Sequence, residues 1–249
     1  MLLAEITALF TIDLAYAAAI TLVAGVIKGF AGFGGGMFMV PLFSILYGPV
    51  DAVIMILLLE APANVVLLPR ALRDTNWSLV TPIVIATLVS IPVGTYVLVT
   101  VDGDLLRRVI GVAVLFFVAV MYTGWRYRGA LNATTSFGAG IAAGFLAGSG
   151  GMGGPVLVMY LMADPDTFAA RVRGSMLTIA MFLIAYMLLN LAMFDAVNSA
   201  PVWRSVVLVP MIMVGAWAGT RLFLVASELF FRRFALLFIG VAGLIAIIK

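Results

Sequence analysis

KGFAGFGGGMFMVPLF, residues 28–43, is the stretch that decides the fold, because it places a run of glycines inside a long apolar segment. From residue 14 to residue 50 the only charge is Lys28. About 20 residues of helix already cross ~30 Å of hydrocarbon, so this segment is too long for one span. Dense glycine weakens a helix. The pattern therefore predicts two helical pieces joined by unwound backbone, which is tolerated at membrane depth only inside protein or along a cavity.

A second stretch, AGFLAGSGGMGGPVLVMY at residues 143–160, lies in an uncharged segment from 129 to 163 and predicts the same break. Gly29-Phe30 recurs as Gly144-Phe145, and Arg107-Arg108 recurs further on as Arg232-Arg233. We expect two homologous halves, residues 12–128 and 129–249, each of about four helical segments with the first one broken by glycine. Paired broken helices point to a transporter binding site. The alternative is an old duplication without present mechanistic meaning.

Composition places the whole chain in the membrane. Of its 249 residues 65% are hydrophobic and 10% charged, with a mean hydropathy of +1.24, whereas soluble domains carry roughly a quarter charged residues. Further apolar runs lie at 52–69, 79–101, 109–125, 176–194, 205–220 and 234–248. They lack the alternation of barrel strands. We therefore expect an all-α, polytopic protein with a single transmembrane domain over residues 1–249.

Missing residue types exclude several functions. The chain has no Cys and no His, which removes thiolate nucleophiles, Cys-based metal sites and the commonest general base. The net charge of +3 comes from basic residues scattered between apolar runs, a pattern of membrane flanks and not of nucleic-acid binding. We predict no enzyme activity, no cofactor and no metal. No Walker-type phosphate-binding sequence is present either.

The arginines favour one topology. If each glycine segment is a re-entrant hairpin, basic residues divide eight to four between the two sides; if each segment crosses fully, they divide evenly. The positive-inside rule favours hairpins. The halves are then inverted repeats, with both termini on the periplasmic side.

The two glycine stretches resemble those of the sulfite exporter TauE/SafE family of bacterial membrane transporters, and the resemblance covers nearly the whole chain. It implies secondary transport of small sulfur-containing anions, such as sulfite, sulfoacetate or other organosulfonates, mostly outward across the cell inner membrane. The second motif departs from a plain triple glycine, so the two halves need not contact the ligand equally.

The candidate substrate site begins at the glycine breaks. A half-helix starting near Gly36 or Gly151 would present free amides and a positive dipole end to an anion, while the missing side chains allow close approach. Tight helix packing is the alternative. The residues predicted to bind substrate are Lys28, Gly34, Gly35, Gly36, Asn64, Ser149, Gly150, Gly151, Gly153 and Arg221.

Two charged residues lie deep in apolar runs. Lys28 follows Asp13 by 15 residues, about 22 Å of helix, and would supply the fixed positive charge; the alternative is a snorkelling lysine. Glu60 lies near the middle of its run, where desolvation favours the neutral carboxyl, and Asn64 follows at i+4 on the same face. We predict Glu60 as the proton-coupling residue; the alternative is a structural partner of Lys28.

Some assignments stay open. Arg221 is expected mainly to snorkel to an interface, with anion contact as the second interpretation, and Ser149 is a weak hydroxyl donor. Competing functions are an anion channel and, less favoured, an intramembrane enzyme, which the absence of His disfavours. The expected partners are a small anionic substrate, the lipid bilayer and possibly a second copy in a homodimer, with no nucleic acid.

Overall fold

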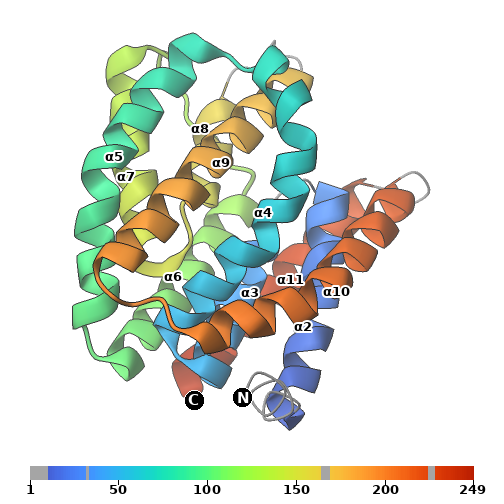
Figure 1. Cartoon of the computed structure of the whole chain (residues 1–249). Coiled ribbons are helices and arrows are strands. Elements are labelled where there is room, and N and C mark those ends of the chain that lie inside the picture. Colours follow the sequence, from blue (N-terminus) through green and yellow to red (C-terminus); the bar gives the residue numbers. More distant parts are fainter. Residues whose placement is uncertain (1–10, 32–33, 164–168, 224–227) are drawn as a thin grey trace. The chain divides into compact units, whose positions relative to one another are not determined.

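The computed structural model describes residues 11–31, 34–163, 169–223 and 228–249, and within these ranges the chain is helical without any strand (Figure 1). Among the described residues, five helices are long and apolar enough to cross a membrane: Ile12–Phe30, Trp77–Thr100, Gly103–Tyr122, Arg171–Met193 and Ser199–Leu222. The expected all-α, polytopic membrane fold is confirmed.

Helices follow the predicted order along the chain. The first half contains α2 (Ile12–Ala31), α3 (Gly35–Tyr47), α4 (Pro49–Asp74), α5 (Trp77–Thr100) and α6 (Gly103–Tyr122). The second half contains α7 (Ala133–Gly150), α8 (Gly154–Leu161), α9 (Ala169–Met193), α10 (Ser199–Phe223) and α11 (Glu228–Ile248). In each half the first segment is broken at its glycines, as α2/α3 and α7/α8.

The helices form two compact units that draw on both halves of the sequence. Unit 1 comprises Met1–Leu59, Asp102–Tyr122 and Val197–Lys249, and unit 2 comprises Glu60–Val101 and Thr123–Ala196. Helix α4 begins in unit 1 and ends in unit 2. These units do not coincide with residues 12–128 and 129–249, and the duplication stays a prediction from sequence.

In unit 1, α2 and α10 run parallel with their backbones in contact. A side chain at Gly25 would meet the carbonyl oxygen of Ile212 at 2.6 Å, and one at Gly219 would meet the amide nitrogen of Phe30 at 2.9 Å. Thr220 Oγ1 adds a hydrogen bond to the Gly29 carbonyl at 3.4 Å. Small residues at such a crossing let the helices approach closely, which is how helices associate in lipid.

Unit 2 has a comparable parallel pair, α5 and α7. A side chain at Gly140 would lie 2.5 Å from the Ile83 carbonyl oxygen, and one at Gly148 would lie 2.6 Å from that of Ile91. Helix α9 also runs parallel to α5: Ser175 Oγ accepts from the Asn76 amide at 3.0 Å, and Tyr186 OH donates to the Leu88 carbonyl at 3.0 Å. The starts of α5, α7 and α9 therefore lie at the same end of unit 2.

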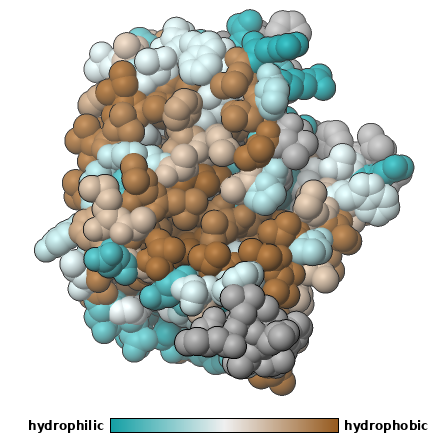
Figure 2. Space-filling model, viewed as in Figure 1, coloured by the Kyte–Doolittle hydropathy of each residue, from teal (hydrophilic) through white to brown (hydrophobic). Residues whose placement is uncertain are grey.

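Apolar side chains cover much of the surface, as a lipid-facing protein requires. Figure 2 shows a mostly hydrophobic face with hydrophilic side chains gathered toward its margins. On α5 the exposed residues include Ile85, Val89 and Val93, at 51–61% exposure. Such a continuous apolar surface on a soluble monomer would promote association, whereas hydrocarbon solvates it in a bilayer.

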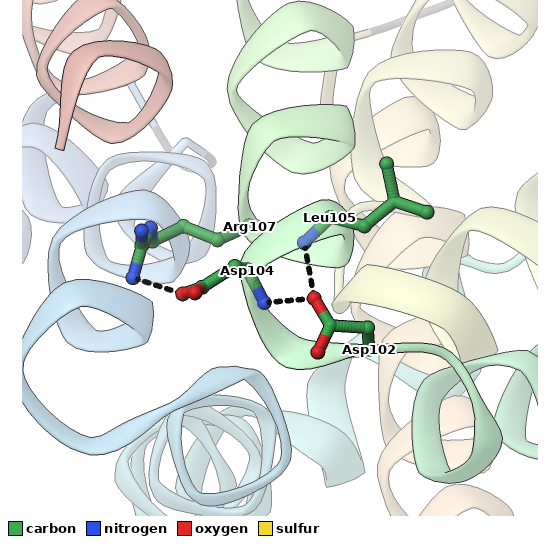
Figure 3. Close-up of polar contacts among 4 residues, drawn as sticks. All are labelled: Asp102, Asp104, Leu105 and Arg107. Atoms are coloured by element: carbon green, nitrogen blue, oxygen red, sulfur yellow. Dashed lines mark hydrogen bonds and ion pairs between the residues drawn. The ribbon is translucent and has the colours of Figure 1, made fainter.

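Helix α6 begins with a side-chain cap (Figure 3). Asp102 Oδ1 accepts hydrogen bonds from the amides of Asp104 and Leu105 at 3.1 and 3.0 Å. Asp104 also forms an ion pair with Arg107 at 3.1 Å. A carboxylate at a helix start satisfies amides that have no helical partner, so α6 starts sharply just after α5 ends.

Candidate functional site

The first glycine segment is a helical hairpin. Helix α2 ends at Ala31, and α3 starts at Gly35 after Gly34, whose φ of 91° lies in the left-handed region that favours glycine. Gly35 lies against α2, because a side chain there would meet the Ala24 carbonyl oxygen at 2.9 Å. At the other end of α3, the Tyr47 ring lies with its centroid 4.4 Å from Arg204 Cζ, near the start of α10, which runs parallel to α2. The chain thus returns to the end where α2 began.

The start of α3 lies beside Lys28. The Cβ position of Gly35 is 3.2 Å from Lys28 Cβ, and the Lys28 side chain is half-buried. The first helical hydrogen bond runs from the Phe38 amide to the Gly34 carbonyl at 3.1 Å, so the amides of Gly35, Gly36 and Met37 precede the helical ladder. Three amides, a positive helix end and the stem of the Lys28 side chain therefore occupy one neighbourhood within unit 1.

The length of α3 bears on how deep this neighbourhood would lie in a membrane. The 13 residues of α3 rise about 20 Å, whereas the hydrocarbon layer is ~30 Å thick. A hairpin that starts at one membrane surface therefore places the start of α3 inside the bilayer. The depth of the glycine break and of Lys28 in the membrane stays a prediction from the sequence.

The second glycine segment is also a hairpin, in unit 2. Tyr160, near the end of α8, shares hydrogen bonds of 2.9 Å with Ser136 and with Thr135 in the first turn of α7. At the break, a side chain at Gly153 would meet the Ala143 carbonyl oxygen at 2.6 Å. The two legs are antiparallel, and α8 ends where α7 began.

The second break differs from the first in the number of backbone amides that are free to donate a hydrogen bond. Gly150 is the last residue of α7, and Gly151, at φ 67°, caps that helix by donating to the Ala147 carbonyl at 2.8 Å. Helix α8 starts three residues later, after Gly153, and Pro155 in its first turn has no amide hydrogen. The expected helix start near Gly151 therefore lies at Gly154, and α8 offers fewer amide donors than α3.

Packing accounts for two of the predicted glycines. Gly35 and Gly153 both lie against the backbone of the preceding helix. At these two positions glycine is needed for close helix packing, which was the alternative to close approach of a ligand. At Gly35 the missing side chain leaves room for the backbone of α2.

Glu60 and Asn64 lie on the continuous helix α4, so their i+4 spacing does put them on one face. Asn64 is 2% exposed and Glu60 is half-buried. Pro62 lies inside the helix between them and leaves the Leu58 carbonyl without its helical donor. A carboxyl, an amide and a backbone acceptor therefore lie within seven residues of one another along the helix α4.

Ser149 and Arg221 have local partners. Ser149 Oγ donates to the Phe145 carbonyl at 2.8 Å, within its own helix. The Arg221 guanidinium lies 5.5 Å from the ring centroid of Trp217, and both side chains are exposed. An exposed cation stacked on an exposed tryptophan at a helix end is typical of a membrane interface.

Sequence reasoning missed a charged cluster in unit 1. Arg204 on α10 donates to Asp51 on α4 at 3.2 Å, and its Cζ lies 4.4 Å from the centroid of the Tyr47 ring on α3. Both charged side chains are only 22–23% exposed. The sequence signal was available in hindsight, since Asp51 and Arg204 each stand directly before an apolar run.

The comparison with known families agrees with this architecture. A model of the sulfite exporter TauE/SafE family matches residues 17–245, nearly the whole chain. The chain belongs to this family. Membership of the TauE/SafE family implies a multi-pass membrane transporter, of the sulfite-exporter type, that carries a small anion. No curated protein and no solved structure matches the chain.

The TauE/SafE assignment fits a transporter and not an enzyme. The residues matched by the family include both hairpins, Glu60, Asn64 and Arg221. Among the residues that the structure describes, no group of three or more acidic side chains is placed to hold a metal ion.

Proposed function

We propose that this chain is a secondary transporter that exports small sulfur-containing anions, such as sulfite, sulfoacetate or other organosulfonates, across the bacterial inner membrane and couples that export to protons. The observation that carries the proposal is the start of α3. There, Gly35 lies against Lys28 and three amides precede the helical ladder. An oxyanion accepts hydrogen bonds from such amides and gains from the helix dipole.

Charge strengthens this site for an oxyanion. Lys28 is half-buried near the end of an apolar helix, where a cation is costly and usually functional or paired. An anion bound at the start of α3 would interact with an ammonium group whose stem leaves α2 next to Gly35.

Glu60 is proposed as the proton carrier. It is half-buried on α4, one turn before the buried Asn64. If anion binding favours protonation of Glu60, protonation must favour anion binding by the same factor. That reciprocity is what moving a proton together with an anion requires. The Glu60→Gln variant fixes the neutral state and keeps the shape of the side chain.

The first experiment is a thermal-shift screen of the purified protein against sulfite, thiosulfate, sulfate, sulfoacetate, taurine and acetate. A ligand that binds only the folded protein raises the melting temperature. We expect sulfite or a sulfonate to raise it and acetate to leave it unchanged. The same screen on Lys28→Met should show a weaker response, whereas Arg108→Met, an exposed charge on α6, should respond like the wild type.

The second experiment measures transport in proteoliposomes. We expect a pH gradient to drive accumulation of the anion identified in the screen. Glu60→Gln should keep anion-for-anion exchange and lose the dependence on the gradient. Flux that ignores the gradient in the wild type would favour the anion channel, and a Lys28→Met protein that binds the anion as well as the wild type would contradict the proposed site.

A further inference from the structure

Six arginines lie at one end of unit 2. They belong to the end of α4, to the connection between α6 and α7, and to the first turns of α9, and all six side chains are exposed. We call this group the arginine end: Arg70, Arg73, Arg126, Arg128, Arg171 and Arg173. Figure 2 shows hydrophilic side chains gathered over the end of α4 and the start of α9.

Packing brings these arginines to the same end. The start of α9 abuts the end of α4, because a side chain at Gly174 would lie 2.8 Å from Asp74 Cβ and 3.0 Å from the Ala71 carbonyl oxygen. Arg171 and Arg173 lie just before Gly174 on one helix, and Arg70 and Arg73 lie next to Ala71 and Asp74 on the other. Four guanidinium groups therefore come from two touching helix ends.

The remaining two arginines flank Tyr127. The Tyr127 amide donates to the Met159 carbonyl at 3.1 Å, and its ring lies 5.4 Å from that of Tyr160. Tyr160 in turn contacts the first turn of α7. Because α5, α7 and α9 run parallel, the start of α7 lies at the same end as the start of α9, and Arg126 and Arg128 lie there too.

The arginine end carries more positive than negative charge. Among the described residues, none of the six guanidinium groups has an ion pair or a hydrogen bond, in contrast to Arg107 and Arg204 in unit 1. The acidic residues that stand near these arginines in the sequence are Asp74, Asp164 and Asp166. Arginines therefore outnumber carboxylates, and the surface attracts anions.

Aromatic and apolar side chains set the level of this surface in the membrane. Trp77 is the first residue of α5 and is 46% exposed, and Trp125, next to Arg126, is 51% exposed. Tryptophan is enriched where hydrocarbon meets headgroups. Further along α5, Ile85 and Val89 are exposed. A molecule bound here would meet guanidinium groups, indole rings and an apolar helix face in succession.

We propose that the arginine end binds the headgroups of anionic phospholipids. Arginine binds phosphate with paired hydrogen bonds, and the exposed apolar residues next to it suit acyl chains. A nucleic acid or an acidic peptide would satisfy the arginines but would leave that apolar face uncovered. In this proposal the arginine end holds anionic lipid independently of the transported anion.

The test uses the full-length protein purified in detergent, where membrane orientation has no effect. Mixed micelles with increasing dioleoyl phosphatidylglycerol or dioleoyl phosphatidylcholine are titrated in, and the lipid concentration that half-saturates the rise in unfolding temperature is measured. We expect phosphatidylglycerol to act at much lower concentration. Each arginine near a lipid surface contributes about fivefold in affinity, so R171Q/R173Q should raise the half-saturating concentration roughly 30-fold.

The matched control is R108Q/K249Q, which removes two exposed charges outside the arginine end and should change the value little. Equal responses to the two lipids, or equal responses of the two double variants, would overturn the proposal. Sodium phosphate is tested alone as well. If it raised the unfolding temperature as much as phosphatidylglycerol does at the same concentration, the proposal would be overturned, because the site would then bind anions in general. If R171Q/R173Q does not fold, the same titration is run on the wild type with added salt. The salt must weaken the stabilisation by phosphatidylglycerol and leave the stabilisation by phosphatidylcholine unchanged; any other result would overturn the proposal.

Discussion

Arg204 Nη1 donates a hydrogen bond to Asp51 Oδ2 across 3.2 Å while its guanidinium covers the ring of Tyr47. This contact joins the beginning of α10, the beginning of α4 and the end of α3, all within unit 1. It lies at the open end of the first hairpin, opposite to the glycine break.

Asp51 makes this contact sensitive to pH. Asp51 stands in the first turn of α4, before the apolar run that begins at Ala52. Burial raises the pKa of Asp51 above its usual value, and Arg204 opposes that rise by its charge and hydrogen bond. The Arg204→Met variant removes the opposition and leaves a half-buried carboxylate. We expect a loss of about 1–2 kcal/mol at neutral pH, given the partial exposure of the pair.

The sign of the pH effect follows from proton binding. When the pKa is raised in the folded state, the folded protein holds the proton more tightly than the unfolded chain, so stability rises as pH falls through that pKa. Thermal unfolding of Arg204→Met should therefore recover part of its loss on mild acidification, and Asp51→Asn/Arg204→Met should not. A loss that is independent of pH would contradict this account.

Replacing either of two glycines of α7 by alanine should change the stability of the protein in opposite directions. A side chain at Gly144 would collide with Ser90 and lie 2.9 Å from Thr87 Cα, whereas one at Gly138 would meet nothing within 4 Å. Gly144→Ala should destabilise unit 2 by about 1–3 kcal/mol through overpacking. Gly138→Ala should stabilise α7 by up to about 1 kcal/mol. Melting temperatures of both variants check this, and equal effects would argue against close α5–α7 packing.

The hydroxyl of Tyr160 should stabilise the second hairpin. It contacts Ser136 and Thr135 at 2.9 Å, and the side chain is 4% exposed. Tyr160→Phe leaves the buried Ser136 hydroxyl without this partner, which should cost about 1–2 kcal/mol. Adding Ser136→Ala should cost less than it does in the wild type, because the partner is already lost. Strictly additive unfolding energies would disprove the coupling.

The second hairpin, α7 and α8, predicts from which side of the membrane its two ends can be labelled. The chain has no native cysteine, so single cysteines at Ala130 and Met162, before α7 and after α8, report where the segment begins and ends. Both should react with an impermeant reagent from the same side of the membrane. Reaction from opposite sides would mean a full crossing.

The cap of α6 offers a local test. Asp102→Ala removes the acceptor of two amides and should cost about 1 kcal/mol. Asp102→Asn keeps an acceptor oxygen and should cost much less. Asp104→Ala serves as the control, because it removes only an ion pair with one strongly exposed partner. A similar melting temperature for Asp102→Ala and Asp102→Asn would show that the cap contributes little.

Sequence patterns predicted the features that depend on local chemistry. The interruptions at Gly34 and Gly151 follow from backbone freedom, and both residues do adopt positive φ. The shared face of Glu60 and Asn64 follows from helical periodicity, since both lie on the continuous helix α4. Each of these needs only residues that are close in the chain.

The pairing of helices could not be predicted. One apolar face resembles another, so nothing in the sequence indicated that α2 packs on α10 or that α7 packs on α5. For the same reason, the packing role of Gly35 and Gly153 was not separable from ligand approach, since it depends on the backbone carbonyls of Ala24 and Ala143. The Tyr47–Arg204 contact brings together residues far apart in sequence and was missed.

The pairing of α2 with α10 also sets the order in which the chain can be assembled. The Gly29 carbonyl and the Thr220 hydroxyl are 191 residues apart, and α11 supplies a further partner of α3 through Phe38 and Phe238. Unit 2 is fully synthesised once Ala196 has left the ribosome, whereas the first hairpin must wait in the membrane for the last two helices. Biogenesis therefore completes the middle of the chain first and closes the part that holds Lys28 last.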